Sequence, residues 1–166
     1  MLVAGCGSGS QSTSGAAPSS TIAAEVPSGF DPCNDIPQGV LDSLQLESKI
    51  PAKASADGGV EWKGCRWVKS NYYAISIRTT NLTIDMVRDK HFQDTQEYTL
   101  AGRRAISTRQ VPEHPNNNCS VDVDMKGGSL EFFLSNSPSD QSADMNTCDM
   151  AREVAEKVVQ ILPAGV

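Results

Sequence analysis

Five cysteines are the residues of this 166-residue chain whose type and spacing could do chemistry. With Cys6 set aside, four remain, and four thiols in an oxidising compartment usually form two disulfides. Three connectivities are possible. We favour Cys33–Cys65 with Cys119–Cys148, which close two consecutive loops of about thirty residues. On the chain-entropy account, each bridge would stabilise the domain by ~3–4 kcal/mol.

Zinc and redox chemistry fit these thiols poorly. The chain has no C-x-x-C pair and no H-x-x-x-H spacing, and its cysteines are too far apart for a zinc knuckle. The acidic residues Asp140, Asp144 and Asp149 lack the ligand spacing and glycine of a calcium loop. We therefore expect no metal and no cofactor.

Cys6 belongs to a different motif. The run Val3-Ala4-Gly5-Cys6, with Leu2 before it, resembles a bacterial lipobox, in which the cysteine is acylated and becomes the mature N-terminus. Residues 1–6 are then the remnant of a lipoprotein signal peptide. Because the charged and apolar regions of such a signal do not precede them, we expect a translation start further upstream or a trimmed chain. An ordinary free thiol at Cys6 is the alternative.

The segment that follows has the composition of a tether. Between residues 7 and 24 nearly every residue is Gly, Ser, Thr, Ala or Pro. Such a segment buries too little apolar surface to offset its ordering entropy. We expect residues 7–28 to be a flexible tether and residues 29–166 to form one domain.

Catalytic residues are not expected. His91 and His114 are the two histidines, and the chain has no G-x-S-x-G motif beside which either could serve a nucleophile. Asp122 and Asp124 alternate along one arm of a predicted hairpin, where paired carboxylates could do acid–base work. We expect both on the wet face of that hairpin, as solubilising charges.

Aromatic and basic residues supply the candidate contacts. Trp62 and Trp67 fall on opposite faces of a regular strand, so one is expected in the core and the other half-exposed; a bulge near Gly64 would put both on one face. Arg103 and Arg104 form a small basic spot that could meet an anionic ligand, although an exposed strand pair is the default. These two tryptophans and two arginines are the candidate ligand or partner contacts.

The elements that must position these residues are read from periodicity. Cys148, Ala151, Val154, Ala155 and Val158 repeat at three- and four-residue steps, which predicts a helix capped by Asn146 and stopped by Pro163. Alternation and turn residues predict the remaining elements. These are helices at 37–46, with Pro37 in the first turn, and at 83–92, a loop at 51–59, and strands at 60–69, 72–80, 96–100, 103–110, 121–125 and 130–134. The whole predicts an α+β fold with a mainly antiparallel sheet packed against helices, including a long C-terminal helix.

Several of these features together resemble one family. The chain is similar to the actinobacterial lipoprotein family labelled domain of unknown function 3558. The matching features are Asp31-Pro32-Cys33, Cys65-Arg66-Trp67, Ala101-Gly102-Arg103-Arg104-Ala105, Cys119-Ser120-Val121, and the helix from Cys148 to Ile161-Leu162-Pro163. The resemblance implies an envelope lipoprotein with paired cysteines, and it implies no catalytic residue.

Composition limits the partners. The chain has a net charge of -6 and lacks the basic stripe of a nucleic-acid binder, so we expect no nucleic-acid partner. The same negative charge disfavours docking on anionic lipid headgroups. We expect a monomer, held by its acylated cysteine (palmitate) on the extracytoplasmic face of the cell membrane. The leading hypothesis is a non-enzymatic module that binds an envelope protein or a cell-wall ligand. The alternatives are a carrier of a small apolar or lipid ligand in a pocket between sheet and helices, and an enzyme with an unrecognised site.

Overall fold

The computed structural model describes Met1 and residues 21–137, 139 and 141–166. Within them, the chain forms seven strands, four α-helices and one 3-10 turn. The helices are α1 (Pro32–Asp35), α2 (Gln38–Leu44), α3 (Ile84–Arg88) and α4 (Thr147–Val159), and the turn is η1 (Pro115–Asn117). The strands are β1 (Glu47–Ala56), β2 (Val60–Lys69), β3 (Tyr73–Thr80), β4 (Gln93–Leu100), β5 (Arg103–Arg109), β6 (Asn118–Met125) and β7 (Gly128–Ser135).

All seven strands join one antiparallel sheet in the order β1-β2-β3-β7-β6-β5-β4. Consecutive hairpins build each half, and the pairing of β3 with β7 joins the halves. The predicted α+β fold with a mainly antiparallel sheet is confirmed. Among the described residues, no helix is both long enough and apolar enough to cross a bilayer.

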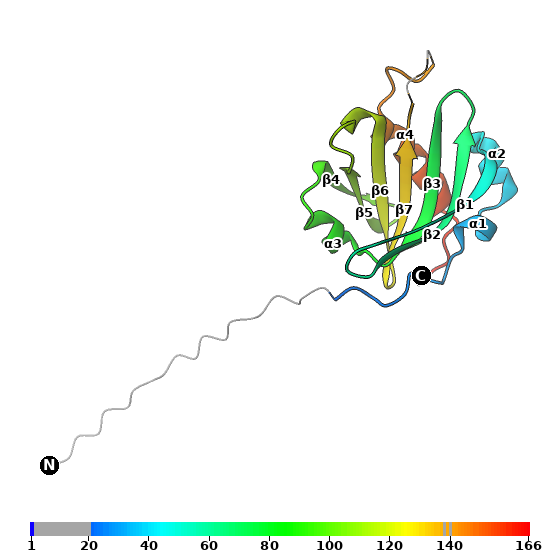
Figure 1. Cartoon of the computed structure of the whole chain (residues 1–166). Coiled ribbons are helices and arrows are strands. Elements are labelled where there is room, and N and C mark those ends of the chain that lie inside the picture. The colour runs from blue at the N-terminus through cyan, green and yellow to red at the C-terminus, as the bar shows by residue number, and fades with distance from the viewer. Residues whose placement is uncertain (2–20, 138, 140) are drawn as a thin grey trace.

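One face of the sheet, here called the helix face, packs against α4 (Figure 1). The side chain of Asn146 caps this helix by accepting from the backbone N–H groups of Cys148 and Asp149, as predicted. The apolar stripe of α4 then lies on a core contributed by β2, β3, β6 and β7. Its fully buried members include Trp67, Ile75, Ile77, Val121, Val123, Leu130, Phe132, Leu134, Ala151 and Val154.

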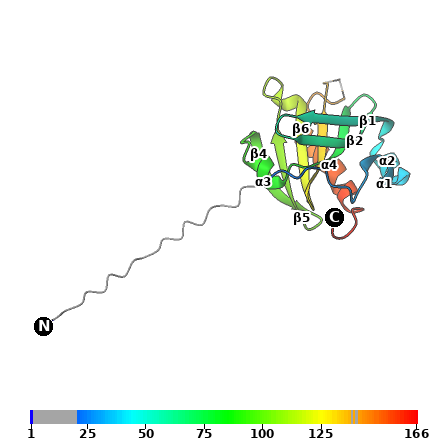
Figure 2. The ribbon, with the colours of Figure 1, turned by 60° about the horizontal axis from the view of Figure 1, so that its bottom comes forward.

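The opposite face, here called the front face, carries a second, smaller core. Its buried residues are Val60, Leu82, Ile84, Val87 and Ile106. The β1–β2 ribbon crosses in front of β6 and β7, and α3 lies beside β5 (Figures 1 and 2). Each of the central strands therefore has buried residues on both of its faces.

Gly64 permits the close approach of β2 and β3. A Cβ atom at this position would lie 2.1 Å from the carbonyl oxygen of Ile77, inside contact distance. No register shift occurs between β2 and β3. The bulge considered near Gly64 is therefore absent, and the glycine instead leaves room for the neighbouring backbone.

Two predicted elements need correction. Residues 51–56, expected in a loop, belong to β1, because proline is tolerated on an edge strand, and no strand among the described residues pairs with the outer side of β1. The helix predicted over 83–92 ends at Arg88, and His91 follows it in a left-handed conformation with φ of 53°. The chain turns there because β4 begins at Gln93, where it pairs with β5.

Candidate functional site on the front face

Arg78 is the centre of the candidate site. Its Nε and one terminal nitrogen both donate to Oε2 of Glu131, at 2.9 and 2.6 Å. Its guanidinium lies 5.6 Å from the ring centroid of Trp62 and 6.0 Å from that of Phe133. The side chain of Arg78 is 16% exposed, while that of Glu131 is 3% exposed. Two half-buried aromatic rings and a buried carboxylate thus hold one cation at the surface.

The register of the sheet places these groups in one row. Arg78 lies opposite Glu131 across β3 and β7, and Glu131 lies opposite Asp122 across β7 and β6. Gly64 on β2 lies opposite Arg78 on β3 and belongs to the same row. Neighbouring strands therefore bring one cation and two carboxyls together on the front face.

Asp122 has few hydrogen-bond donors. The hydroxyl of Ser120 donates to its Oδ2 at 3.1 Å and also lies 3.5 Å from Glu131 Oε1. The hydroxyl of Ser129 lies 3.4 Å from Oδ1 and 2.8 Å from the carbonyl oxygen of Leu82, so its single proton is shared between two acceptors. No cation contacts Asp122 among the described residues, so an ionised carboxylate would be poorly compensated there.

The two carboxyls consequently differ in protonation. Burial raises the pKa of Asp122 well above its ordinary value, and the neighbouring charge of Glu131 raises it further. Burial also raises the pKa of Glu131, but Arg78 opposes that rise through its charge and its hydrogen bonds. We assign the proton to Asp122 and the negative charge to Glu131 at neutral pH, which leaves the cluster electrically balanced.

Asp122 was predicted on a wet hairpin face, and that prediction is wrong. Its residue is 1% exposed, whereas Asp124, two positions later, is half-buried. The alternation of the hairpin is real, but its second face is partly covered by the β1–β2 ribbon and α3, so that the part around Asp122 is shielded from water. A one-sided hairpin cannot be distinguished from a two-sided one by period alone.

The two tryptophans separate as predicted. Trp67 is 1% exposed in the core of the helix face, and Trp62 is half-buried on the front face. Only Trp62 therefore belongs to the candidate site.

The two predicted contact arginines do not form a shared basic spot. Arg103 donates to the backbone carbonyls of Asp124, Pro163 and Val166. Arg104 pairs with Asp85 at 2.8 Å and lies 3.6 Å from Glu97. The charge and hydrogen bonds of Arg104 hold the pKa of the Asp85 carboxyl below its usual range. Each cation is already engaged within the domain.

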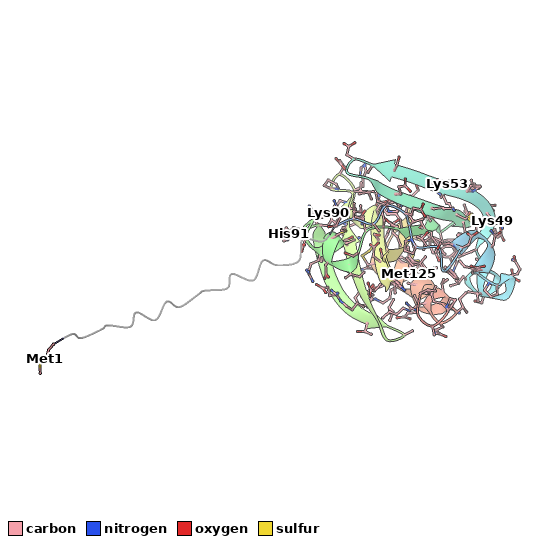
Figure 3. The ribbon with its side chains drawn as sticks, turned by 90° about the horizontal axis from the view of Figure 1, so that it is seen from below. Met1, Lys49, Lys53, Lys90, His91 and Met125 are labelled. Carbon is pink, nitrogen blue, oxygen red and sulfur yellow. A yellow bond between two sulfur atoms is a disulfide. The ribbon has the colours of Figure 1, made fainter. Side chains whose placement is uncertain are left out.

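Both predicted disulfides are present. Cys33–Cys65 joins α1 to β2, and Cys119–Cys148 joins β6 to the first turn of α4. Cys6 lies outside the described residues. His91 and His114 are both exposed, and Figure 3 shows His91 at the opposite side of the molecule from Lys49 and Lys53.

The hollows of the described surface are open grooves with mixed walls. A groove of about 520 Å³ runs between residues 25–32 and β2, and includes Glu25, Asp31, Glu61 and Lys63. Residues 21–28, the last part of the predicted tether, lie against the domain there: Ile22 packs on the smaller core, and Ala23 accepts a hydrogen bond from Asn81. The space between the sheet and α4 is filled by side chains that are fully buried. These hollows offer little to a carrier of apolar ligands.

Arg78, Glu131 and Phe133 were not predicted as site residues from the sequence. A usable signal was present, because Arg78 interrupts the run Ile75–Thr80 and Glu131 interrupts Leu130–Leu134. A single charge within an apolar strand needs a partner, and one of each sign in two strands predicts an ion pair if the strands are adjacent. The adjacency of β3 and β7, fifty-three positions apart at these residues, was the missing fact.

A family model described as a protein of unknown function (DUF3558) matches residues 1–160. No curated protein and no solved structure matches the chain.

Proposed function

The chain belongs to the DUF3558 family of proteins of unknown function, and from that premise we propose that it is a lipid-anchored binding module of the bacterial cell envelope. Acylated Cys6 anchors it to the extracytoplasmic face of the membrane, and the front face of the sheet contacts an envelope partner. The same proposal includes the actinobacterial source that the motifs suggest.

The observation that carries the binding role is the Trp62–Arg78–Phe133 stack. Aromatic rings and arginine are the side chains that dominate binding energy at protein interfaces. Here Glu131 holds the arginine in place, so little conformational entropy would be lost on contact. Exposed Arg66 and half-buried Val68 extend this surface along β2.

A non-enzymatic role fits the carboxyl pair better than catalysis. Asp122 and Glu131 have the divided protonation of an acid–base pair. Their residues are 1% and 2% exposed, however, and Arg78 and Trp62 lie above Glu131. A substrate would have to displace an ion pair and an aromatic ring to reach them. We therefore assign this pair to the support of the binding surface.

Location outside the cytoplasm is supported by the two disulfides. Structural disulfides persist in oxidising compartments and are rare in the cytosol. The small residues before Cys6 and the Ser/Gly/Ala/Pro-rich segment after it add the pattern of an anchor and a tether. Stable anchoring needs more than one acyl chain, which lipoprotein processing supplies.

The binding surface is tested by crosslinking in intact cells. A photoreactive benzoylphenylalanine replaces Val68 on the front face, and a second variant carries it at exposed Lys157 on α4. We expect a reproducible adduct from position 68 and none from position 157. Arg66→Glu should weaken that adduct, and Lys157→Glu should not. Equal adducts from both positions would overturn the assignment of the front face.

The anchor is tested separately by metabolic labelling with alkyne-tagged palmitate. The wild-type protein should incorporate the label and fractionate with membranes, and Cys6→Ser should lose both properties. An unlabelled wild-type protein in a host that acylates other lipoproteins would contradict the anchor without touching the crosslinking result.

A further inference from the structure

The edge strand β1 is almost entirely exposed to solvent. Nine of its ten residues are exposed, and Ala52 is half-buried. It pairs with β2 on one side and is the last strand of the sheet. A strand edge in this position presents a row of backbone N–H and C=O groups that another extended chain can bond.

Pro51 shows which backbone groups point outward. Proline has no N–H, and it lies directly opposite Cys65 in the register, so its nitrogen must face the open edge instead of β2. Antiparallel pairing alternates, so Lys53 and Ser55 also turn their N–H and C=O groups outward. The intervening Ala52 and Ala54 exchange hydrogen bonds with β2.

The bulge and the proline that protect this edge lie in its first half, and Lys53 is the one protective side chain in its second half. The first half has a bulge between Glu47 and Ile50, where Ser48 has φ of 59°, followed by Lys49 and Pro51. Bulges, lysines and prolines are the devices by which proteins block edge pairing. Residues 52–56 keep an unbroken register with β2, and the side chains there are small except for Lys53. The second half is therefore the accessible one.

Charge favours an acidic partner at this half. Lys53 lies directly opposite Lys63, an unfavourable pair, and neither lysine has an ion-pair partner among the described residues. Residues 47–69 contain five Lys or Arg against three Asp or Glu, although the whole chain has a net charge of -6. Figure 3 shows Lys53 at the margin of the molecule on β1. A groove of about 330 Å³ between these lysines is lined by Ala54, Ser55, Glu61 and half-buried Trp62.

We propose that the edge of β1 over residues 52–56 receives an extended acidic segment of a partner protein as an eighth strand. The proposal rests on the proposed binding role and names the class of partner. A second copy of this chain is a poorer occupant, because antiparallel self-pairing centred on Lys53 would place lysine against lysine.

The test is amide hydrogen exchange by NMR on the full-length chain with both disulfides formed. Two synthetic eight-residue peptides serve as probes, one alternating threonine with aspartate and the other alternating threonine with lysine. At several millimolar acidic peptide, we expect exchange of the Lys53 and Ser55 amides to slow about tenfold. The Ala54 amide, already bonded to β2, should not change. Absence of protection, or equal protection by the cationic peptide, overturns the proposal.

Matched variants at the edge sharpen this test. Ser55→Pro removes one outward N–H and repeats the native arrangement at Pro51, so it should abolish protection of Lys53 while leaving the melting temperature near that of Ser55→Ala. Ser55→Ala keeps the N–H and should behave as wild type. Lys53→Glu, which needs no backbone change, should reverse the preference to the cationic peptide. Unchanged protection in both Ser55→Pro and Lys53→Glu contradicts the proposal.

Pairing of β1 with a second copy of the chain would give a different result in the exchange experiment. Protection of Lys53 and Ser55 that grows with protein concentration, without peptide, would replace the acidic partner with a second copy. Failure of the peptide test leaves the crosslinking test of the Trp62–Arg78 surface standing, because that surface lies on the front face and not at the edge.

Discussion

The two faces of the sheet bury different kinds of side chain. The helix face buries aliphatic and aromatic side chains under α4, and a disulfide from β6 to α4 fixes the layers together. The front face buries an ion pair and a second carboxyl, whose pKa is raised by burial, beside a small apolar core. Because strand residues alternate, Val121 and Asp122 are adjacent in sequence and lie in these two environments.

Stability and binding depend on different faces of the sheet. Apolar packing is indifferent to exact geometry within limits, and it supplies most of the free energy of folding. A buried ion pair contributes little net stability, but it is strongly destabilising when one partner is lost. The front face is therefore the part of the molecule that holds side chains in a defined arrangement, and the helix face is the part that keeps the sheet folded.

Removing Arg78 should have the largest effect. Arg78→Ala leaves Glu131 buried beside Asp122 without a cation, and we expect a loss of about 3–5 kcal/mol in the free energy of unfolding. Chemical denaturation monitored by Trp fluorescence measures it. Arg78→Ala combined with Glu131→Gln is the control, and it should recover part of the loss. A loss below about 1 kcal/mol in the single variant would mean that the front face tolerates an unpaired charge.

Removing a disulfide should have a comparable but slightly smaller effect on the helix face. Cys119→Ala with Cys148→Ala opens a loop with a sequence separation of 29 and should lower stability by ~3–4 kcal/mol. The melting temperature should fall by roughly 10 °C, measured by calorimetry. The Cys33–Cys65 bridge, with a separation of 32, serves as the matched comparison and should give a similar decrease. If reductant left the melting temperature of the wild-type protein unchanged, the predicted decrease would be contradicted for both disulfides.

Neutralising Asp122 should stabilise the protein and change its pH dependence. Its pKa is raised in the folded state, so the folded protein binds more protons than the unfolded chain as pH rises above the ordinary carboxyl range. The contribution of Asp122 to stability then falls with rising pH until the folded pKa is passed, and Asp122→Asn removes that loss. We expect a gain of about 1–2 kcal/mol at neutral pH.

The comparison is measured by thermal melts of both proteins at pH 4, 6 and 8. The difference in melting temperature should be smallest at pH 4 and should grow with pH. Asp124→Asn, on the same strand but half-buried, is the control and should show no such trend. A difference that shrinks as pH rises would show that Asp122 is ionised in the folded protein.

The smallest effect is expected at the surface ion pairs. Arg104→Ala removes the contact with Asp85, in which both side chains are more than 40% exposed. Such pairs contribute about 0–1 kcal/mol and are screened by salt. Denaturation midpoints of Arg104→Ala and wild type should nearly coincide in 0.5 M salt. A large salt-independent loss would show that the arginine packs against the domain in a way that its exposure does not suggest.

Much of the architecture was predictable because it follows from local patterns. The stripe of Val154, Ala155 and Val158 and the cap at Asn146 predicted α4. The disulfide pairing favoured from loop lengths is confirmed. The strand over 51–56 was missed because Pro51 and a run of small residues resemble a loop, and only a vacant edge allows a strand there.

The candidate site was less predictable because its members come from four strands. Trp62 was singled out for its type, but Arg78 and Glu131 acquire meaning only when β3 and β7 are known to be neighbours. Arg103 and Arg104 were instead predicted to act together because they are neighbours in the sequence, and that prediction is wrong. Adjacent in sequence, they point to opposite faces of β5 and are engaged by different parts of the chain.

The sequence alone determined the strand and helix periods, the thiols available for pairing and the lipobox-like run at Cys6, because each depends on residues close together in the chain. Tertiary structure decided that Asp122 is buried, which raises its pKa, that Arg78 lies near two aromatic rings, and that β1 is the last strand of the sheet. The physical reason is that burial and charge compensation depend on which strands become neighbours, and strand order is a property of the whole fold.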